Sequence, residues 1–223
     1  MEIIKKHYEP LGFTITKVSG TGHWNVLRLY DPSENKYYIA KGIIHIEGNN
    51  EMGPELMNKS YNNEKSIIAD LPDWWGLELR DAFIENPLRI IVTNEIPNCK
   101  WSEFRGNDSE IAEQLYKQIE WLHSNGIAHN DLELKNVLLT CDSKKAIIID
   151  FEKASRSSKN INMREDYRKI ISNLKESKST HGIGKVLEKL ALGKLPIIRR
   201  HSIGGYSKKH KTRKARKSRK NLK

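Results

Sequence analysis

The stretch H-N-D-L-E-L-K-N at residues 129–136 decides how this chain is interpreted, together with the aspartate that follows the apolar run at residues 146–149. Phosphoryl transfer needs a positioned hydroxyl, neutralised phosphates and a bound metal ion, with little covalent help from the protein. Asp131 offers a carboxylate that can orient a hydroxyl group and accept its proton. Asn136 and Asp150 offer the hard oxygen ligands that Mg²⁺ prefers. We therefore expect Asp131 to be catalytic and Asn136 and Asp150 to bind magnesium.

The segments on either side of this stretch predict the elements that hold it. Residues 109–124 carry apolar side chains at a helical spacing between capping signals. Residues 137–139 and 146–149 predict two short strands around a polar turn at 142–145. The expected order is therefore a helix, the polar loop, a hairpin and a metal ligand.

A second group of motifs lies nearer the start of the chain. Gly20 and Gly22, within S-G-T-G-H-W-N-V at residues 19–26, allow backbone amides to approach phosphate oxygens, and Val26 is placed to cover a base. Lys41 follows at the end of the strand pattern Y-Y-I-A-K. A glycine pair alone is more often a hairpin turn. The lysine at this distance favours a phosphate-binding loop instead.

Taken in order, these motifs resemble the eukaryotic-like protein kinase superfamily over roughly residues 12 to 175. The glycine pair is similar to G-x-G-x-x-G-x-V, with Asn25 at the third glycine, and the segment ending at Lys41 is similar to the third-strand motif V-A-I-K. Residues 129–136 are similar to the catalytic loop. The resemblance implies an α+β, two-lobed protein-kinase-like fold with a small β-rich N-lobe and a truncated helical C-lobe.

The resemblance also implies further contacts to a nucleotide. Glu64, in a segment similar to the kinase C-helix, is expected to pair with Lys41, although Glu51 and Glu55 compete for that role. Residues 93–97, T-N-E-I-P, resemble the hinge. The expected ATP-binding residues are Gly20, Gly22, Val26, Ala40, Lys41, Glu64, the gatekeeper Thr93, and the backbone of Asn94 and Ile96.

Three departures from the family pattern narrow the interpretation. Asn130 replaces the usual arginine, so an activation-loop phosphate has no evident basic pocket. Glu133 stands where Ser/Thr kinases have a lysine, and Lys135, at a position that some tyrosine kinases use, is expected to be the catalytic cation instead. Glu152 replaces the glycine of D-F-G and removes its conformational freedom. Choline and aminoglycoside kinases resemble the chain in these H-N-D and D-F-E motifs.

The region after Asp150 is short. Only about 56 residues separate Asp150 from a basic tail, and there is no A-P-E signature. We therefore expect a reduced or missing peptide-binding platform and a shape closest to the RIO kinases and the small kinase of the KEOPS complex. The expected divisions are an N-lobe and hinge at residues 1–97, a reduced C-lobe at 98–200 and a basic, disordered tail at 201–223.

The positive charge of the chain is concentrated in that tail. The sequence has 39 lysines and arginines against 28 aspartates and glutamates, a formal net charge of +11. Ten of the basic residues and no acidic residue lie in residues 207–223, so the rest of the chain is close to neutral. A disordered basic segment suits nucleic acid, bound through its phosphates, or another acidic partner. A solvated tail without a partner and an anchor for an acidic membrane surface are the alternatives.

Two features bear on the location of the protein. The chain has no apolar leader at its start and no transmembrane segment, because no apolar run is long enough to span a bilayer. Cys99 and Cys141 are its only cysteines and are expected to be free thiols in a reducing compartment. We therefore expect an intracellular location, cytoplasmic or nuclear.

These observations together predict an ATP- and Mg²⁺-dependent phosphotransferase. The favoured form is a small atypical protein kinase that acts on a protein substrate, at serine or threonine rather than tyrosine. Two alternatives stay open: a small-molecule kinase of the choline or aminoglycoside type, and a nucleotide-binding scaffold or weak ATPase. The second alternative stays open because Glu133 and Glu152 are unusual.

Overall fold

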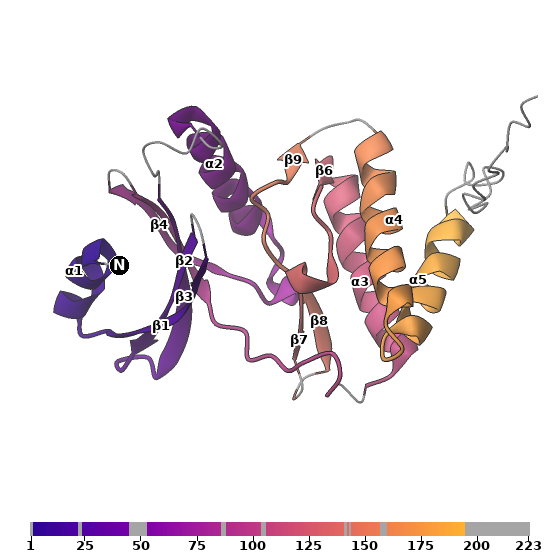
Figure 1. Ribbon diagram of the computed structural model, residues 1–223, viewed down its shortest axis with the longest axis horizontal. Helices are drawn as coiled ribbons and strands as arrows, with labels where there is room; N and C mark the ends of the chain where they lie inside the picture. Colours follow the sequence, from indigo (N-terminus) through magenta and orange to yellow (C-terminus); the bar gives the residue numbers. More distant parts are fainter. Residues whose placement is uncertain are drawn as a thin grey trace, which may run out of the picture.

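The computed structural model consists of a β-sheet part followed by a mainly helical part (Figure 1). The α+β, kinase-like fold class predicted from the sequence is confirmed. The basic tail predicted at 201–223 lies outside the described residues. Within the described ranges no helix is both long and apolar enough to pass through a bilayer. The structure describes residues 2–21, 24–44, 53–85, 88–103, 106–140, 142, 144–156 and 160–194.

A five-stranded antiparallel sheet forms the N-terminal part. Its strands lie in the order β1-β2-β3-β5-β4, so β3 is central. The turn between β2 and β3 is fixed by Asp31, whose Oδ1 accepts hydrogen bonds from the amide and the hydroxyl of Ser33. The strands are β1 (Thr14–Thr21), β2 (Trp24–Asp31), β3 (Lys36–Ile44), β4 (Leu79–Glu85) and β5 (Leu88–Asn94).

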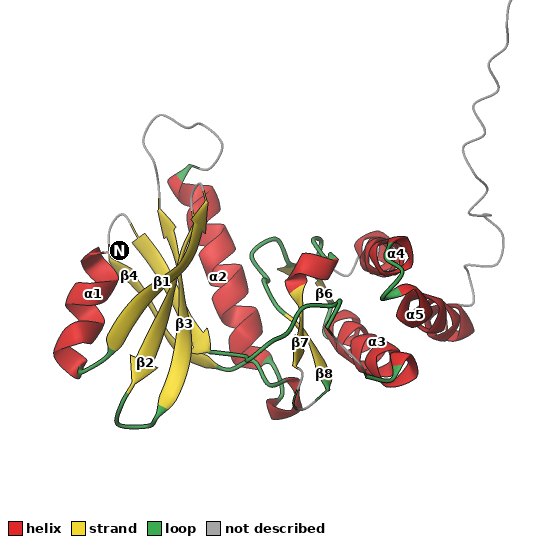
Figure 2. Cartoon of the chain, turned by 60° about the horizontal axis from the view of Figure 1, so that its bottom comes forward, coloured by secondary structure: helices red, strands yellow, loops and turns green. Residues whose placement is uncertain are grey.

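The two faces of this sheet have different neighbours. Helix α1 (Glu2–Tyr8) covers one face, and helix α2 (Pro54–Asp70) lies on the other side, as Figure 2 shows. Because successive side chains of a strand alternate between faces, Lys41 and Ala40 point in opposite directions. The buried cluster beneath α1 consists of Ile4, Tyr8, Leu27, Leu29, Tyr38, Ala40, Leu88, Ile90 and Val92.

The C-terminal part is built from three helices and two pairs of short strands. The β7–β8 hairpin lies between the sheet part and the helices, and β6 pairs with β9. Of the short 3-10 helices, Leu134–Asn136 lies in this part, whereas Glu9–Leu11 and Asp73–Trp75 lie in the N-terminal part. The elements are α3 (Asp108–Ser124), β6 (Ile127–Ala128), β7 (Val137–Thr140), β8 (Lys145–Ile148), β9 (Ser155–Arg156), α4 (Asn160–Glu176) and α5 (His181–Lys194).

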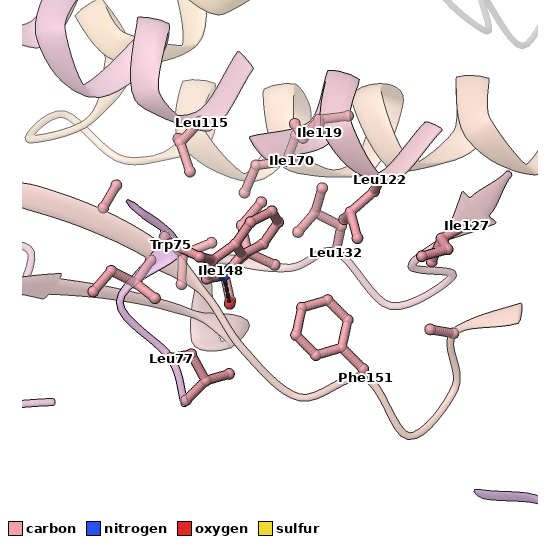
Figure 3. Close-up of a cluster of buried hydrophobic side chains, with 14 of the residues drawn as sticks. Trp75, Leu77, Leu115, Ile119, Leu122, Ile127, Leu132, Ile148, Phe151 and Ile170 are labelled. Carbon is pink, nitrogen blue, oxygen red and sulfur yellow. Dashed lines mark hydrogen bonds between the residues drawn. The ribbon is translucent and has the colours of Figure 1, made fainter. Parts of the chain in front are cut away.

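A buried cluster ties the hairpin to the helices (Figure 3). Phe151 is fully buried in it and lies beside the rings of Trp75 and His129. The indole Nε1 of Trp75 donates to the carbonyl of Ile148 at 3.0 Å, the dashed line in Figure 3. The hydrogen bond to the carbonyl of Ile148 and the burial of Phe151 therefore fix the main chain on both sides of Asp150.

Helix α3 confirms the helix predicted at residues 109–124 to within one residue. Asn107 caps it, because its side chain accepts a hydrogen bond from the amide of Ser109 at 2.9 Å. The helix ends at Ser124, immediately before Asn125. The amphipathic pattern was sufficient to locate this element.

Two glutamines of α3 satisfy the free edge of β8. Gln118 accepts from the amide of Ile148 at 2.9 Å and donates to the carbonyl of Ala146 at 2.6 Å. Gln114 accepts from the amide of Ala146 at 2.9 Å and donates to the carbonyl of Lys144 at 3.2 Å. Since β8 pairs only with β7 in its sheet, these side chains take the place of another strand.

The expectation of free thiols is wrong at Cys99. This residue is disulfide-bonded, and Cys141 lies outside the described residues. The amide of Cys99 also donates to the carbonyl of Leu139 at 2.9 Å. A disulfide removes one of the arguments for a reducing compartment, so the intracellular location stays a prediction.

Candidate active site

Lys41, on β3, meets Glu64, on α2. The Nζ atom of Lys41 lies 3.1 Å from Oε1 and 3.2 Å from Oε2 of Glu64. Burial raises the pKa of Glu64 to about 7, against the attraction of Lys41, which acts to lower it. Glu55, which competed for this role, is exposed, and Glu51 lies outside the described residues. The expected pair is therefore Lys41 and Glu64.

Two more carboxylates approach Lys41 from the C-terminal part. Asp150 accepts a hydrogen bond from its Nζ directly, and Oε2 of Glu152 lies 3.7 Å from the same atom. Burial acts to lower the pKa of Lys41, but the carboxylates outweigh it and raise that pKa above its ordinary value. Asp150 has a φ of 69°, a left-handed conformation uncommon outside glycine. Lys41 and Asp150 therefore face the same space.

Asn136 joins the catalytic loop to the segment after β8 that carries Asp150. Its Nδ2 donates to the carbonyl of Asp131 at 2.8 Å, and its own carbonyl accepts from the amide of Ile149 at 2.9 Å. Because Nδ2 is used in this way, the side-chain oxygen is the atom that can face a cation. The hairpin thus brings the two expected metal ligands, Asn136 and Asp150, to one end.

Asp166, on α4, was not among the expected site residues, yet it holds the start of the catalytic loop. Its carboxylate accepts from the amides of His129 and Asn130, both at 2.8 Å. These bonds fix Asn130 at a φ of 62°, immediately before Asp131. The side chain is 1% exposed and shares the apolar stripe of α4 with Ile170. An acid on such a stripe needs a buried partner, and this was the available sequence signal.

Two further polar side chains of α4 contact the same loop. Lys169 donates to the carbonyl of Asn130 at 3.1 Å, and Asn173 accepts from the amide of Leu134 at 3.2 Å. With Asp166 they follow the spacing i, i+3 and i+7, which places them on one face of the helix. This face of α4 therefore holds the main chain of the loop on both sides of Asp131.

Lysines surround the carboxylate of Asp131. Lys153 donates to Oδ2 at 3.0 Å, and Lys135 lies 3.9 Å from the same oxygen. Lys169 lies 4.0 Å from Oδ1. Burial acts to raise the pKa of Asp131, but the lysines outweigh it and lower that pKa. Lys135, the expected catalytic cation, lies closer to Glu133, at 3.0 Å.

The strands distribute the expected base-covering residues over both faces of the sheet. Val26 lies directly opposite Lys41, and Thr93 lies opposite Ile39, so both share the face of Lys41. Ala40 lies on the other face, buried beneath α1, and the expectation that it binds ATP is therefore wrong. In V-A-I-K the alanine is two residues before the lysine, whereas Ala40 is adjacent to it. Ile39 occupies the equivalent place.

The remaining expected nucleotide contacts lie in the glycine-rich and hinge segments. Gly20 lies in β1, and Gly22 lies outside the described residues. At the hinge, the amide of Asn94 donates to the carbonyl of Glu78 at 3.2 Å, so this N–H is not available to a base. Ile96 is buried. Binding through the carbonyl of Asn94 and the amide of Ile96 stays a prediction.

Asn130, which replaces the usual arginine, has a structural role. Its Nδ2 donates to the carbonyl of Lys153 and to Oγ of Ser155, both at 2.9 Å. These bonds fasten the segment after Asp150 to the catalytic loop. A short side chain thus makes local contacts where a longer basic one would extend toward an activation loop.

Comparisons with known proteins agree with this geometry. The model of the lipopolysaccharide kinase (Kdo/WaaP) family matches residues 100–183, which contain Asp131, Asn136 and Asp150. Serine/threonine-protein kinase D of Synechocystis sp. is 25% identical over 126 residues, 54% of this chain and 25% of that protein. Probable serine/threonine-protein kinase 2 of Plasmodium falciparum is 27% identical over 144 residues, 57% of this chain and 28% of that protein. These findings support a protein-kinase-like superfamily.

The kinase-like similarity is partial in extent. Serine/threonine-protein kinase ppk25 of Schizosaccharomyces pombe is 49% identical over 41 residues, 18% of this chain and 10% of that protein. The chain spans about a quarter of the length of the Synechocystis and Plasmodium relatives. The family model covers the catalytic loop, the hairpin and α4 but not Lys41 or Glu64. The closer resemblance to RIO and KEOPS kinases stays a prediction.

Proposed function

We propose that the protein is a phosphotransferase that uses ATP and Mg²⁺. The observation that carries the proposal is the meeting of Lys41, from the sheet, with Asp150, from the hairpin, beside the buried Glu64. A nucleotide triphosphate needs a cation for its phosphates and oxygen ligands for its metal ion, both facing one space. The matched proteins are all described as kinases, which supports the proposal.

The residues present fit a magnesium ion that is shared with phosphate. Mg²⁺ binds through one or two protein oxygens, with waters and phosphate oxygens completing its shell. Asp150 supplies a carboxylate, and Asn136 supplies an amide oxygen oriented by its bond to Asp131. When bound, the ion neutralises phosphate charge. Glu64 keeps the Lys41 amine directed toward this space, so that Lys41 can bind phosphate.

Asp131 has the role of orienting the acceptor hydroxyl and taking its proton. Its lowered pKa keeps the carboxylate ionised at neutral pH. Asp166 and Asn136 fix the loop on either side of it. Because phosphoryl transfer depends on in-line positioning, this rigid support contributes to rate through geometry.

The proposed acceptor is the hydroxyl of a protein, serine or threonine, as in the names of the matched kinases. A second candidate follows from the family model, whose description names lipopolysaccharide kinases and which covers the catalytic loop. Only residues 157–159 separate β9 from α4, which is too short for a peptide-binding platform of the usual kind. This shortness keeps the second candidate open.

Incubation with γ-labelled ATP and Mg²⁺ tests the proposal. We expect Asp131→Asn to lower label transfer by about 10²- to 10⁴-fold, the usual contribution of a positioned general base, while ATP binding is kept. Asp142→Asn, an exposed acid in the hairpin turn, is the matched control. Label on protein supports the protein kinase, and label on a saccharide or small molecule supports the second candidate. ATP binding without any transfer contradicts the proposal and favours a scaffold.

A further inference from the structure

Two lysines beside Asp131 are not explained by nucleotide binding. Lys153 comes from the segment after Asp150, and its Nζ lies 3.0 Å from Oδ2 of Asp131. Lys169 comes from α4, and its Nζ lies 4.0 Å from Oδ1 of Asp131 and 3.1 Å from the carbonyl of Asn130. Two separate elements therefore direct an ammonium group at the same carboxylate.

Both lysines are accessible to a molecule that binds beside Asp131. Lys135 already lies 3.9 Å from Asp131 and pairs with Glu133 at 3.0 Å. Three ammonium groups thus approach the carboxylate of Asp131, and Glu152 also acts on Lys153. The side chains of Lys153 and Lys169 are 56% and 31% exposed, so a bound molecule can reach both.

The position of the two lysines is on the acceptor side of the site. The nucleotide side is marked by Lys41, which contacts Glu64 and Asp150 rather than Asp131. Lys169 approaches from α4, in the helical part of the molecule. Because both lysines lie beside Asp131, they are close to any acceptor hydroxyl that Asp131 orients.

We propose that Lys153 and Lys169 form an anion-binding site for the acceptor, which carries a phosphate or carboxylate group close to the hydroxyl that is phosphorylated. This inference rests on the proposed function and names its substrate class. Ammonium groups bind such anions through charge-assisted hydrogen bonds. An acceptor anion also competes with Asp131 for Lys153.

The test titrates inorganic phosphate into the full-length protein, saturated with Mg²⁺ and a non-hydrolysable ATP analogue that fills the nucleotide side. We expect the double variant Lys153→Gln/Lys169→Gln to bind phosphate at least about tenfold more weakly, because charged hydrogen bonds contribute at least that factor. Lys185→Gln, exposed on α5, is the control and leaves phosphate binding unchanged. Absent phosphate binding, or equal affinity in wild type and double variant, overturns the inference. Failure of the analogue to bind contradicts the proposed function instead.

Label transfer to matched acceptors identifies the source of the anion. One pair is glycerol 3-phosphate and glycerol, and the other is a serine peptide with or without an adjacent phosphoserine. We expect the anionic member of one pair to be labelled at least about tenfold faster, and the double variant to lose this preference through a higher KM. Equal labelling within both pairs overturns the inference and leaves the phosphotransferase in place. If neither pair is labelled, the phosphate titration alone tests whether Lys153 and Lys169 bind an anion.

Discussion

At the scale of single residues, Lys41 is the point at which the two parts of the molecule meet. Its amine faces Glu64, Asp150 and Glu152, three acids for one base. The Oε2 atom of Glu152 is buried and has no hydrogen-bond partner in the described part of the chain. Such an excess of buried negative charge is unfavourable by itself and is relieved by a bound divalent cation.

The raised pKa of Glu64 predicts a pH-dependent stability. Its folded-state pKa of about 7 lies above the ordinary 4.5, so the folded protein binds the proton more tightly than the unfolded chain. Ionisation of Glu64 therefore costs stability progressively from about pH 4.5 to pH 7. In urea unfolding, we expect wild type to lose up to about 3 kcal/mol relative to Glu64→Gln over that range and nothing further above it. A constant difference between the two proteins contradicts this.

Lys135 and Glu133 offer a second residue-level prediction. If Lys135 is the cation that reaches the transferring phosphate, Lys135→Ala lowers kcat by about 10²-fold or more. Glu133→Ala removes only the acid that holds Lys135 at 3.0 Å, so its effect stays below about tenfold. Equal effects in a steady-state transfer assay show that Lys135 has no special role.

The sequence predicts those residues whose side-chain chemistry phosphoryl transfer requires. Lys41, Asp131 and Asp150 are polar groups in otherwise patterned segments. The structure places Lys41 against Asp150 and Asn136 against Asp131, and the roles of these residues stay predictions. The prediction that Ala40 contacts the nucleotide is wrong because it matches the V-A-I-K motif by residue type alone. Strand side chains alternate between the two faces of the sheet, and this places Ala40 on the face opposite Lys41. Lys153 was missed because its contact with Asp131 spans a sequence distance that no local pattern reveals.

At the scale of elements, the pairing of β8 with glutamine side chains from α3 supports the hairpin. Replacing Gln118 by leucine leaves the buried amide of Ile148 and carbonyl of Ala146 without these partners. We expect a loss of about 2 to 4 kcal/mol in the free energy of unfolding, measured with urea. Glu113→Leu, exposed on the same helix, is the control and changes stability by less than about 0.5 kcal/mol. A similar small change for Gln118→Leu would show that water or a local shift replaces the bonds.

Long amphipathic elements were predictable from sequence and short ones were not. α3 has several apolar turns and clear caps, which fixed its bounds. α4 covers Asn160–Glu176, and its first turns are mainly polar, so no apolar pattern marks where it begins. Strands β6 and β9 have two residues each, too few for any period.

At the scale of the whole molecule, α2 links the sheet to the segment that follows Asp150. Ser60 donates to the carbonyl of Glu152 at 2.9 Å, and Asn63 donates to the carbonyl of Ala154 at 3.0 Å. With Glu64 these residues follow the spacing i, i+3 and i+4 on one face of α2. One helix therefore sets both the amine of Lys41 and the backbone after Asp150. These contacts join residues far apart in the sequence, so no local sequence pattern predicts them. The role of the basic tail stays a prediction.

The central claim is that Lys41 and Asp150 serve one magnesium-bound nucleotide, and calorimetric titration with a non-hydrolysable ATP analogue tests it most directly. Wild type, Lys41→Met and Asp150→Asn are each measured with and without Mg²⁺. We predict that Mg²⁺ tightens binding to wild type at least about tenfold, that Lys41→Met weakens binding in both conditions, and that Asp150→Asn abolishes the magnesium effect. Wild-type affinity and magnesium dependence in both variants would contradict the account.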